Sequence, residues 1–185
     1  MQALTDFADQ AVILPLVLAS ALGISLGGWR RGAVVWLLAI GATLAAVCAA
    51  KLAVLVFGPP ARLPLLVSPS GHAASAPLVY GGLLFALLPG RAGRLTGLVL
   101  GLSICIGMAA TRLVLHEHTV PDVLAGGAIG VAGMLVLYVA LGRPPEAFRR
   151  IATIGLASAV LLGFHGLRLP AEGWLRALAA MLRDG

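Results

Sequence analysis

Long apolar segments separated by short polar ones run through nearly the whole chain. Glycine and proline mark the breaks, as in Gly58-Pro59-Pro60, which is typical of turns. Runs of about 20 apolar residues match the hydrocarbon thickness of a bilayer, where helices or closed barrels are needed to satisfy the backbone. The pattern therefore predicts an all-α, polytopic membrane bundle of about six transmembrane helices. The expected helices are residues 11–28, 33–57, 72–89, 95–115, 121–141 and 151–167.

Composition agrees with this pattern and excludes a soluble domain. Of the 185 residues, 60% are hydrophobic and 11% are charged, whereas soluble proteins carry about a quarter charged residues. We therefore expect residues 1–185 to form a single integral-membrane domain. The formal net charge of +6 does not indicate nucleic-acid binding, because the arginines cluster in short loops between apolar segments.

Charge also predicts an orientation in the membrane. Basic residues gather on one side of the predicted helices, at Arg30, Arg31, Arg91, Arg94, Arg143, Arg149 and Arg150. Acidic residues dominate the other side, at Asp6, Asp9, Glu117, Asp122, Glu172 and Asp184. The positive-inside rule then places both termini outside, and in a bacterium the acidic side of this inner-membrane protein faces the periplasm.

Two further patterns concern packing and the C-terminus. Glycines recur at the four-residue spacing that lets helices approach closely, at Gly23/Gly27, Gly97/Gly101 and Gly126/Gly130, and we interpret them as packing positions. Residues 171–183 carry apolar side chains on one helical face, with Arg176 and Arg183 elsewhere. This predicts an interfacial helix on the outer leaflet, with a stabilising tail favoured over a lid.

Lys51, near the end of the second predicted helix, is the first of three polar patches. A charge inside a membrane segment costs a few kcal/mol unless it reaches water or has a partner. A lysine that only extends to the interface is one interpretation. However, every other basic residue is arginine, so this single lysine favours a role facing an anion.

The second patch, Ser68-Pro69-Ser70-Gly71-His72, opens the third predicted helix. Ser70 suits an N-cap, and free backbone N–H groups at a helix start attract anions. Gly71 allows an oxygen to approach the backbone closely. An ordinary N-cap beside a solvated histidine is the alternative.

The third patch joins Thr111-Arg112 to His118 and Asp122. His118 and Asp122 are four residues apart, so they share a face if the helix begins early, and the carboxylate can then fix the imidazole tautomer. Thr119 and Asp122 also fit a capping box at a helix start. Capping does not account for Arg112 or His118.

Together the three patches resemble the type 2 phosphatidic acid phosphatase (PAP2) superfamily. Its pattern is Lys-x6-Arg-Pro, then Pro-Ser-Gly-His, then Ser-Arg-x5-His-x3-Asp. This chain has Lys51 through Pro59, an unchanged Pro69 to His72, and Thr111 to Asp122 with threonine replacing serine. The resemblance implies a membrane-embedded, metal-independent lipid phosphatase without a cofactor.

The resemblance also implies roles for these residues. His118 would attack phosphorus and become a phosphohistidine, with Asp122 orienting it. His72 would protonate the leaving oxygen and then activate water. The phosphate oxygens would be held by Lys51, Ser70, the Gly71 N–H and Arg112.

One position departs from the family pattern. Gly58 stands where the first motif has arginine, although Pro59 is retained. Arg62, four residues later on the same loop, is the candidate replacement. Otherwise the site works with one cation fewer.

Other functions remain open at this point. His116 and His118, with His72 and Asp122, form an alternative zinc site, although the nearby cations suit a phosphate better. A phosphotransferase would use the same histidine, and a non-catalytic lipid-phosphate binder or transporter would fit the arginine replaced at Gly58. The pattern does not select among undecaprenyl (di)phosphate, phosphatidylglycerol phosphate, phosphatidate and lipid A phosphates, or fix an oligomeric state.

Overall fold

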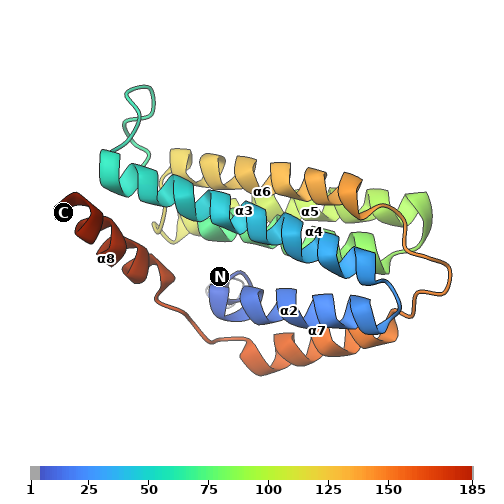
Figure 1. Cartoon of the computed structure of the whole chain (residues 1–185). Coiled ribbons are helices and arrows are strands. Elements are labelled where there is room, and N and C mark those ends of the chain that lie inside the picture. The colour runs from blue at the N-terminus through green and yellow to red at the C-terminus, as the bar shows by residue number, and fades with distance from the viewer. Residues whose placement is uncertain (1–4, 185) are drawn as a thin grey trace.

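The computed structural model describes residues 5–184, and the regular structure in this range is helical (Figure 1). The helices are α2 (Gln10–Leu26), α3 (Arg30–Phe57), α4 (Gly71–Leu87), α5 (Gly90–Val114), α6 (Val120–Leu141), α7 (Ile151–Phe164) and α8 (Ala171–Asp184). Each predicted segment corresponds to one of these helices. The boundaries agree within a few residues, with the largest difference at α5, which begins at Gly90 rather than at residue 95.

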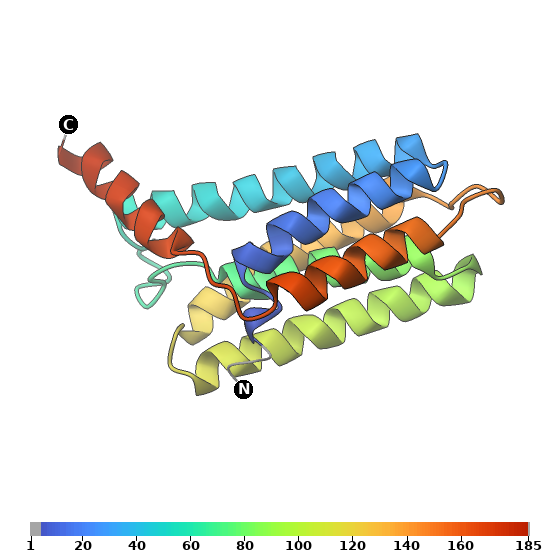
Figure 2. The ribbon, with the colours of Figure 1, turned by 90° about the horizontal axis from the view of Figure 1, so that it is seen from below.

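Helices α2 to α7 form one elongated bundle, and α8 extends away from it at one end (Figures 1 and 2). Helix α4 lies at the centre, packed against α5 and α6, while α7 covers α2. Small residues allow this central position, since 12 of the 17 residues of α4 are buried. Helix α8 packs mainly against α3.

The bundle has the surface of a membrane protein. Within residues 5–184, helices α3, α5 and α6 are long and apolar enough to cross a membrane, and α2, α4 and α7 are apolar but shorter. Large apolar side chains point outward, such as Leu38 at 67% and Leu124 at 66% exposure. An apolar surface of this extent suits contact with the hydrocarbon of a bilayer. The predicted all-α membrane bundle is confirmed.

Glycines bring α6 against α4. A Cβ atom at Gly126 would collide with the backbone of Ser70, and one at Gly130 would collide with the backbone of Ala74. The predicted packing role of this glycine pair is therefore confirmed, because any side chain would push the helices apart. The close approach fixes the first turn of α4 against α6.

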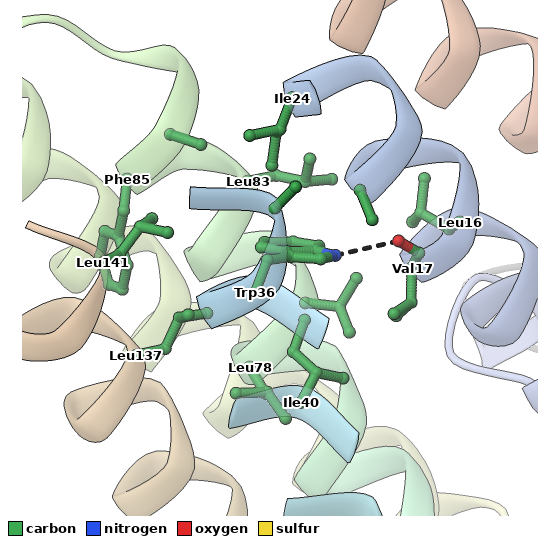
Figure 3. Close-up of a cluster of buried hydrophobic side chains, with 14 of the residues drawn as sticks. Leu16, Val17, Ile24, Trp36, Ile40, Leu78, Leu83, Phe85, Leu137 and Leu141 are labelled. Carbon is green, nitrogen blue, oxygen red and sulfur yellow. Dashed lines mark hydrogen bonds between the residues drawn. The ribbon is translucent and has the colours of Figure 1, made fainter. Parts of the chain in front are cut away.

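A core of buried apolar side chains surrounds Trp36, toward the arginine-rich end of the bundle (Figure 3). The Trp36 side chain is fully buried, and its Nε1 donates a hydrogen bond of 2.9 Å to the carbonyl oxygen of Val17. About 22 Å of helix rise along α3 separates Trp36 from Lys51. The two ends of the bundle therefore differ, with a packed core at one and a polar cavity at the other.

Candidate active site

A cavity of about 560 Å³ lies where α3 and α5 end and where α4 and α6 begin, with α8 on its open side. Residues from all three polar patches line it. They are Lys51, Gly71, His72, Arg112, His118 and Asp122. Side chains up to 71 positions apart in the sequence therefore meet at one end of the bundle.

His118 and Asp122 face each other at the start of α6. Nδ1 of His118 lies 3.4 Å from Oδ2 of Asp122, and the two side chains are 13% and 3% exposed. The capping box predicted for the same segment is also present, because Thr119 N–H donates to Oδ2 of Asp122 and Asp122 N–H donates to Thr119 Oγ1. One carboxylate thus both caps α6 and contacts the imidazole.

Asp122 also anchors the loop that precedes α4. Its Oδ1 accepts hydrogen bonds of 2.8 Å from the N–H groups of both Val67 and Ser68, and its carbonyl accepts one of 2.9 Å from Ser70 N–H. A carboxylate with this many backbone donors is firmly held. The second and third polar patches are therefore one hydrogen-bonded unit.

The chain reverses between α5 and His118 through a Schellman turn. Glu117 N–H donates to the carbonyl of Arg112, and His116 N–H donates to that of Leu113. His116 occupies the left-handed position with φ 55°, where histidine is more common than most non-glycine residues. This turn carries His118 back over the cavity and leaves His116 exposed, outside the cavity lining.

The environment of His118 favours its neutral form. Burial is the main cause that lowers the pKa of His118, and the positive charges of Lys51 and Arg112 lower it further. The hydrogen bond and negative charge of Asp122 oppose these effects without cancelling them. A neutral imidazole has a lone pair available for attack, so the site favours the nucleophilic form.

The first turn of α4 faces the cavity through Gly71 and His72, and not through Ser70. Ser70 is fully buried and caps the helix, with its hydroxyl accepting a 3.4 Å hydrogen bond from Ala73 N–H. A Cβ atom at Gly71 would point toward Lys51, 3.8 Å from its Cε. Gly71 therefore keeps space open between the helix start and the lysine. The role of Ser70 in phosphate binding stays a prediction.

Lys51 has two partners that the sequence did not predict. Its Nζ lies 2.8 Å from Ser68 Oγ and 2.6 Å from Oε2 of Glu172, the second residue of α8. The Lys51 side chain is 7% exposed, so it is a buried charge with a specific counter-ion. The sequence contained only a weak indication of this pair: Glu172 is the only acidic residue in 171–183, and Lys51 is the only lysine of the chain.

Arg112 reaches the cavity from the last turn of α5. Its Nη2 lies 3.5 Å from Oε2 of Glu117, and its side chain is 11% exposed. Among the residues that the structure describes, its Nε is buried and has no hydrogen-bond partner. Thr111, which replaces the serine of the family pattern, is buried and donates to the carbonyl of Met108. Arg112 therefore lines the cavity while its buried Nε has no partner within residues 5–184.

Arg62 is not brought to the site. It is exposed on the loop between α3 and α4 and does not line the cavity. Gly58 ends α3 with φ 82°, in the left-handed region that favours glycine. The glycine in place of arginine thus has a local structural reason, since a side chain there would strain the helix end.

The cavity continues from its polar end along apolar side chains. These are Leu14 and Leu44, Val47, and Leu175 and Leu178 from α8. A smaller space of about 160 Å³ adjoins His72 and Arg112 on the side of Asp6, Asp9 and Arg168. In residues 5–184, no group of three or more His, Cys, Asp or Glu side chains is arranged to hold a metal ion.

Comparison with known proteins adds one family and one relative. Residues 59–145 match the model of the PAP2 superfamily, a range that includes the second and third polar patches. The chain is 29% identical over 188 residues to a protein of Klebsiella pneumoniae described as "Uncharacterized 22.5 kDa protein in cps region". The match covers 96% of this chain and 89% of that protein. No solved structure matches the chain.

Proposed function

We propose that the protein is a membrane lipid phosphatase of the PAP2 superfamily, a family of phosphatases and phosphotransferases whose model matches residues 59–145. The observation that carries the proposal is the His118–Asp122 pair opening onto the same cavity as His72, Lys51 and Arg112. A nucleophile, an orienting carboxylate, an acid and two cations are the groups that phosphoryl transfer through a histidine needs.

His118 is the nucleophile in this proposal. Because Nδ1 faces Asp122, Nε2 is the nitrogen that attacks phosphorus. A P–N bond forms as the P–O bond to the lipid breaks, and Asp122 stabilises the imidazolium that results. Water then attacks the phosphohistidine, which releases inorganic phosphate and returns His118 to its neutral form.

His72 moves the protons in both steps. It lines the same cavity as Arg112 and His118. His72 gives its proton to that oxygen in the first step and takes one from the attacking water in the second. Proton transfer of this kind contributes about 10²–10⁴-fold to a rate.

The charge of the phosphate is balanced by three groups. The ammonium of Lys51 and the guanidinium of Arg112 supply positive charge at the cavity. The first turn of α4 at Gly71 adds backbone N–H groups. These groups would stabilise the negative charge that develops on the substrate in the transition state.

The apolar extension of the cavity fits a substrate with a hydrocarbon chain. Leu44 and Val47 from α3 and Leu175 and Leu178 from α8 line this part of the cavity. A lipid phosphate can place its head group at His118 and keep its chain among these residues. Undecaprenyl (di)phosphate, phosphatidylglycerol phosphate, phosphatidate and lipid A phosphates all have this form.

A phosphotransferase is the second candidate, because the same phosphohistidine can pass its phosphoryl group to another lipid. A non-catalytic lipid-phosphate binder is a third, since Gly58 removes one cation of the family pattern. The buried His118–Asp122 contact argues against a binder, because binding alone requires no oriented nucleophile.

The test is phosphate release by purified protein from a panel of the four lipid classes, with and without EDTA. We expect release from at least one lipid, insensitive to EDTA and inhibited by orthovanadate. Phosphate appearing on a second lipid instead of in solution would make the protein a phosphotransferase. Loss of activity with EDTA and its return with zinc would move the mechanism to a metal site.

We also propose that the site faces the periplasm of the bacterial inner membrane, because the opposite end of the bundle holds the arginine clusters. The test is cysteine labelling in cells, in a background with Cys48→Ala and Cys105→Ala. A cysteine replacing the exposed Pro64 should react with an impermeant thiol reagent, and one replacing the exposed Ala92 should not. The opposite result would place the site in the cytoplasm.

A further inference from the structure

The C-terminal helix α8 is bound to the candidate active site through one carboxylate. Oε2 of Glu172 lies 2.6 Å from Lys51 Nζ, and Oε1 accepts a 3.1 Å hydrogen bond from Ser68 Oγ. Lys51 Nζ also donates to Ser68 Oγ at 2.8 Å. The three side chains therefore form a closed triangle, in which both carboxylate oxygens of Glu172 are used.

These are contacts that a phosphate would also make. A carboxylate and a phosphate both present anionic oxygens to an ammonium and a hydroxyl. The proposed function assigns Lys51 to the substrate phosphate, yet Glu172 holds the lysine here. Two anions at one buried ammonium repel each other, so the phosphate and Glu172 compete for it.

The rest of α8 is weakly held, apart from its contact with α3. Ala179 is 2% exposed, but Trp174, Met181 and Leu182 are exposed at 60%, 71% and 58%. The segment before α8 is fixed to the N-terminal region, since Arg168 pairs with Asp6 at 2.8 Å and Leu169 N–H donates to Asp9 at 3.0 Å. Release of Glu172 would leave α8 to pivot beside this anchored segment.

We propose that Glu172 latches α8 over the cavity when no substrate is bound, and that a lipid phosphate enters by displacing Glu172 from Lys51 and Ser68. This inference rests on the proposed function, and it makes α8 a lid. The exposed apolar face of α8 suits contact with the bilayer that supplies the substrate. The Lys51 charge is thereby never left unpaired, because one anion replaces the other.

The electrostatic state of Glu172 is consistent with a latch at neutral pH. Burial alone would raise the pKa of Glu172, but the hydrogen bond and charge of Lys51 and the hydrogen bond from Ser68 outweigh it, so the pKa is lowered. Glu172 is thus ionised at neutral pH. The side chain is 39% exposed, which lets water reach the carboxylate as it leaves Lys51.

The first test measures the position of α8 directly, with no catalytic readout. Spin labels are placed at the exposed positions Ala177 on α8 and Ala92 on α5, in a background with Cys48→Ala and Cys105→Ala, and their distance distribution is measured by pulsed electron resonance. We expect Glu172→Gln to create a second population without ligand, and orthovanadate to create the same population in the parent. Identical distributions in the parent and in Glu172→Gln would overturn the latch.

Arg176→Gln is the matched control. Arg176 lies 3.6 Å from the same carboxylate and is 63% exposed, so this variant removes an ion pair of Glu172 without touching Lys51. We expect it to keep the parent distribution. A movement as large as that of Glu172→Gln would overturn the specific role of Lys51. Movement with Glu172→Gln but none with orthovanadate would overturn displacement by the phosphate.

The second test is kinetic. The apparent affinity for a substrate increases as the open fraction of the protein increases. Loss of the latch should therefore lower KM about tenfold. Glu172→Asp, which keeps the charge on a shorter side chain, should give a smaller decrease. An unchanged or higher KM in Glu172→Gln would overturn the proposal. By contrast, no phosphate release from any lipid, in either protein, is failure of the proposed function and leaves the distance measurement valid.

Discussion

The two sides of the cavity are built in different ways. On the α6 side, Asp122 accepts hydrogen bonds from the backbone N–H groups of Val67, Ser68 and Thr119, and Gly126 presses against the backbone of Ser70. On the α8 side, the polar attachment to the site is the carboxylate of Glu172. Backbone hydrogen bonds fix a geometry, whereas one partly exposed ion pair can be exchanged for another.

This difference separates two requirements of an enzyme that acts on lipids. The reacting histidine must stay in place within a fraction of an ångström, and the α6 side provides that rigidity. A long-chain substrate must also enter and leave sideways, which requires one wall to move. Under the proposed function and the proposed latch, the chemistry and the access route therefore lie on opposite walls of the cavity.

The largest expected effect tests whether the α6 side carries the chemistry. His118→Ala should lower kcat by several orders of magnitude while leaving the thermal unfolding midpoint near that of the parent, because it removes a covalent nucleophile. Phosphate release from the best lipid substrate is the measurement. His116→Asn is the control, since His116 is exposed at φ 55° and asparagine tolerates that conformation. Activity of His118→Ala above about one percent would reject the nucleophile.

The next effect separates the two roles of Asp122. Asp122→Asn retains an oxygen for the N–H groups of Val67 and Ser68 but loses the negative charge beside His118, so kcat should fall on the order of 10³-fold. Thr119→Val removes the cap of α6 and keeps the carboxylate. It should lower the free energy of unfolding by about 1 kcal/mol and change kcat less than tenfold. Equal kcat losses in both variants would mean that Asp122 acts only as a cap.

A smaller effect distinguishes cations inside the cavity from those outside it. Arg112→Ala should reduce kcat/KM by the equivalent of about 1.5–3 kcal/mol, the range for hydrogen bonds to charged groups. Arg62→Ala should change kcat/KM less than about twofold, because Arg62 is exposed and lies outside the cavity lining. A loss for Arg62→Ala as large as that for Arg112→Ala would bring Arg62 back as the replacement for the arginine at Gly58.

The smallest effect concerns protonation. Burial and the nearby cations lower the pKa of His118, so the ring should lose its proton at a pH below 6.5 and be neutral above it. Histidine-labelled NMR in micelles can follow the titration, with His118→Ala identifying the signal. Lys51→Ala removes a positive charge and should move the midpoint upward. A midpoint at or above 6.5 in the parent would contradict this electrostatic account.

Much of the fold was predictable, because it depends on patterns that are local in sequence. Apolar length and turn residues located six apolar helices, and the four-residue spacing of Gly126 and Gly130 indicated close packing that the structure confirms. The start of α5 was placed five residues late. Gly90 to Arg94 is polar and small, so hydrophobicity gives no signal there even though the backbone is already helical.

Within the candidate site, only the residues that belong to the three sequence motifs could be predicted. Lys51, His72, Arg112, His118 and Asp122 meet as the family pattern implied, because the helix ends that carry them lie at one end of the bundle. Glu172 was not foreseen, since it lies 121 positions from Lys51 and no periodicity links the two. Arg62 was chosen for its closeness in sequence, but it is exposed and does not line the cavity.

Gly126 has a consequence for how variants of this protein will be interpreted. It has no side chain that could take part in the reaction, yet an alanine there would push on the Ser70 backbone and tilt the turn that presents Gly71 and His72. In a survey of single substitutions, the loss of activity in Gly126 variants would suggest that this position is catalytic. Its actual contribution is mechanical, because it transmits the position of one helix to the first turn of another.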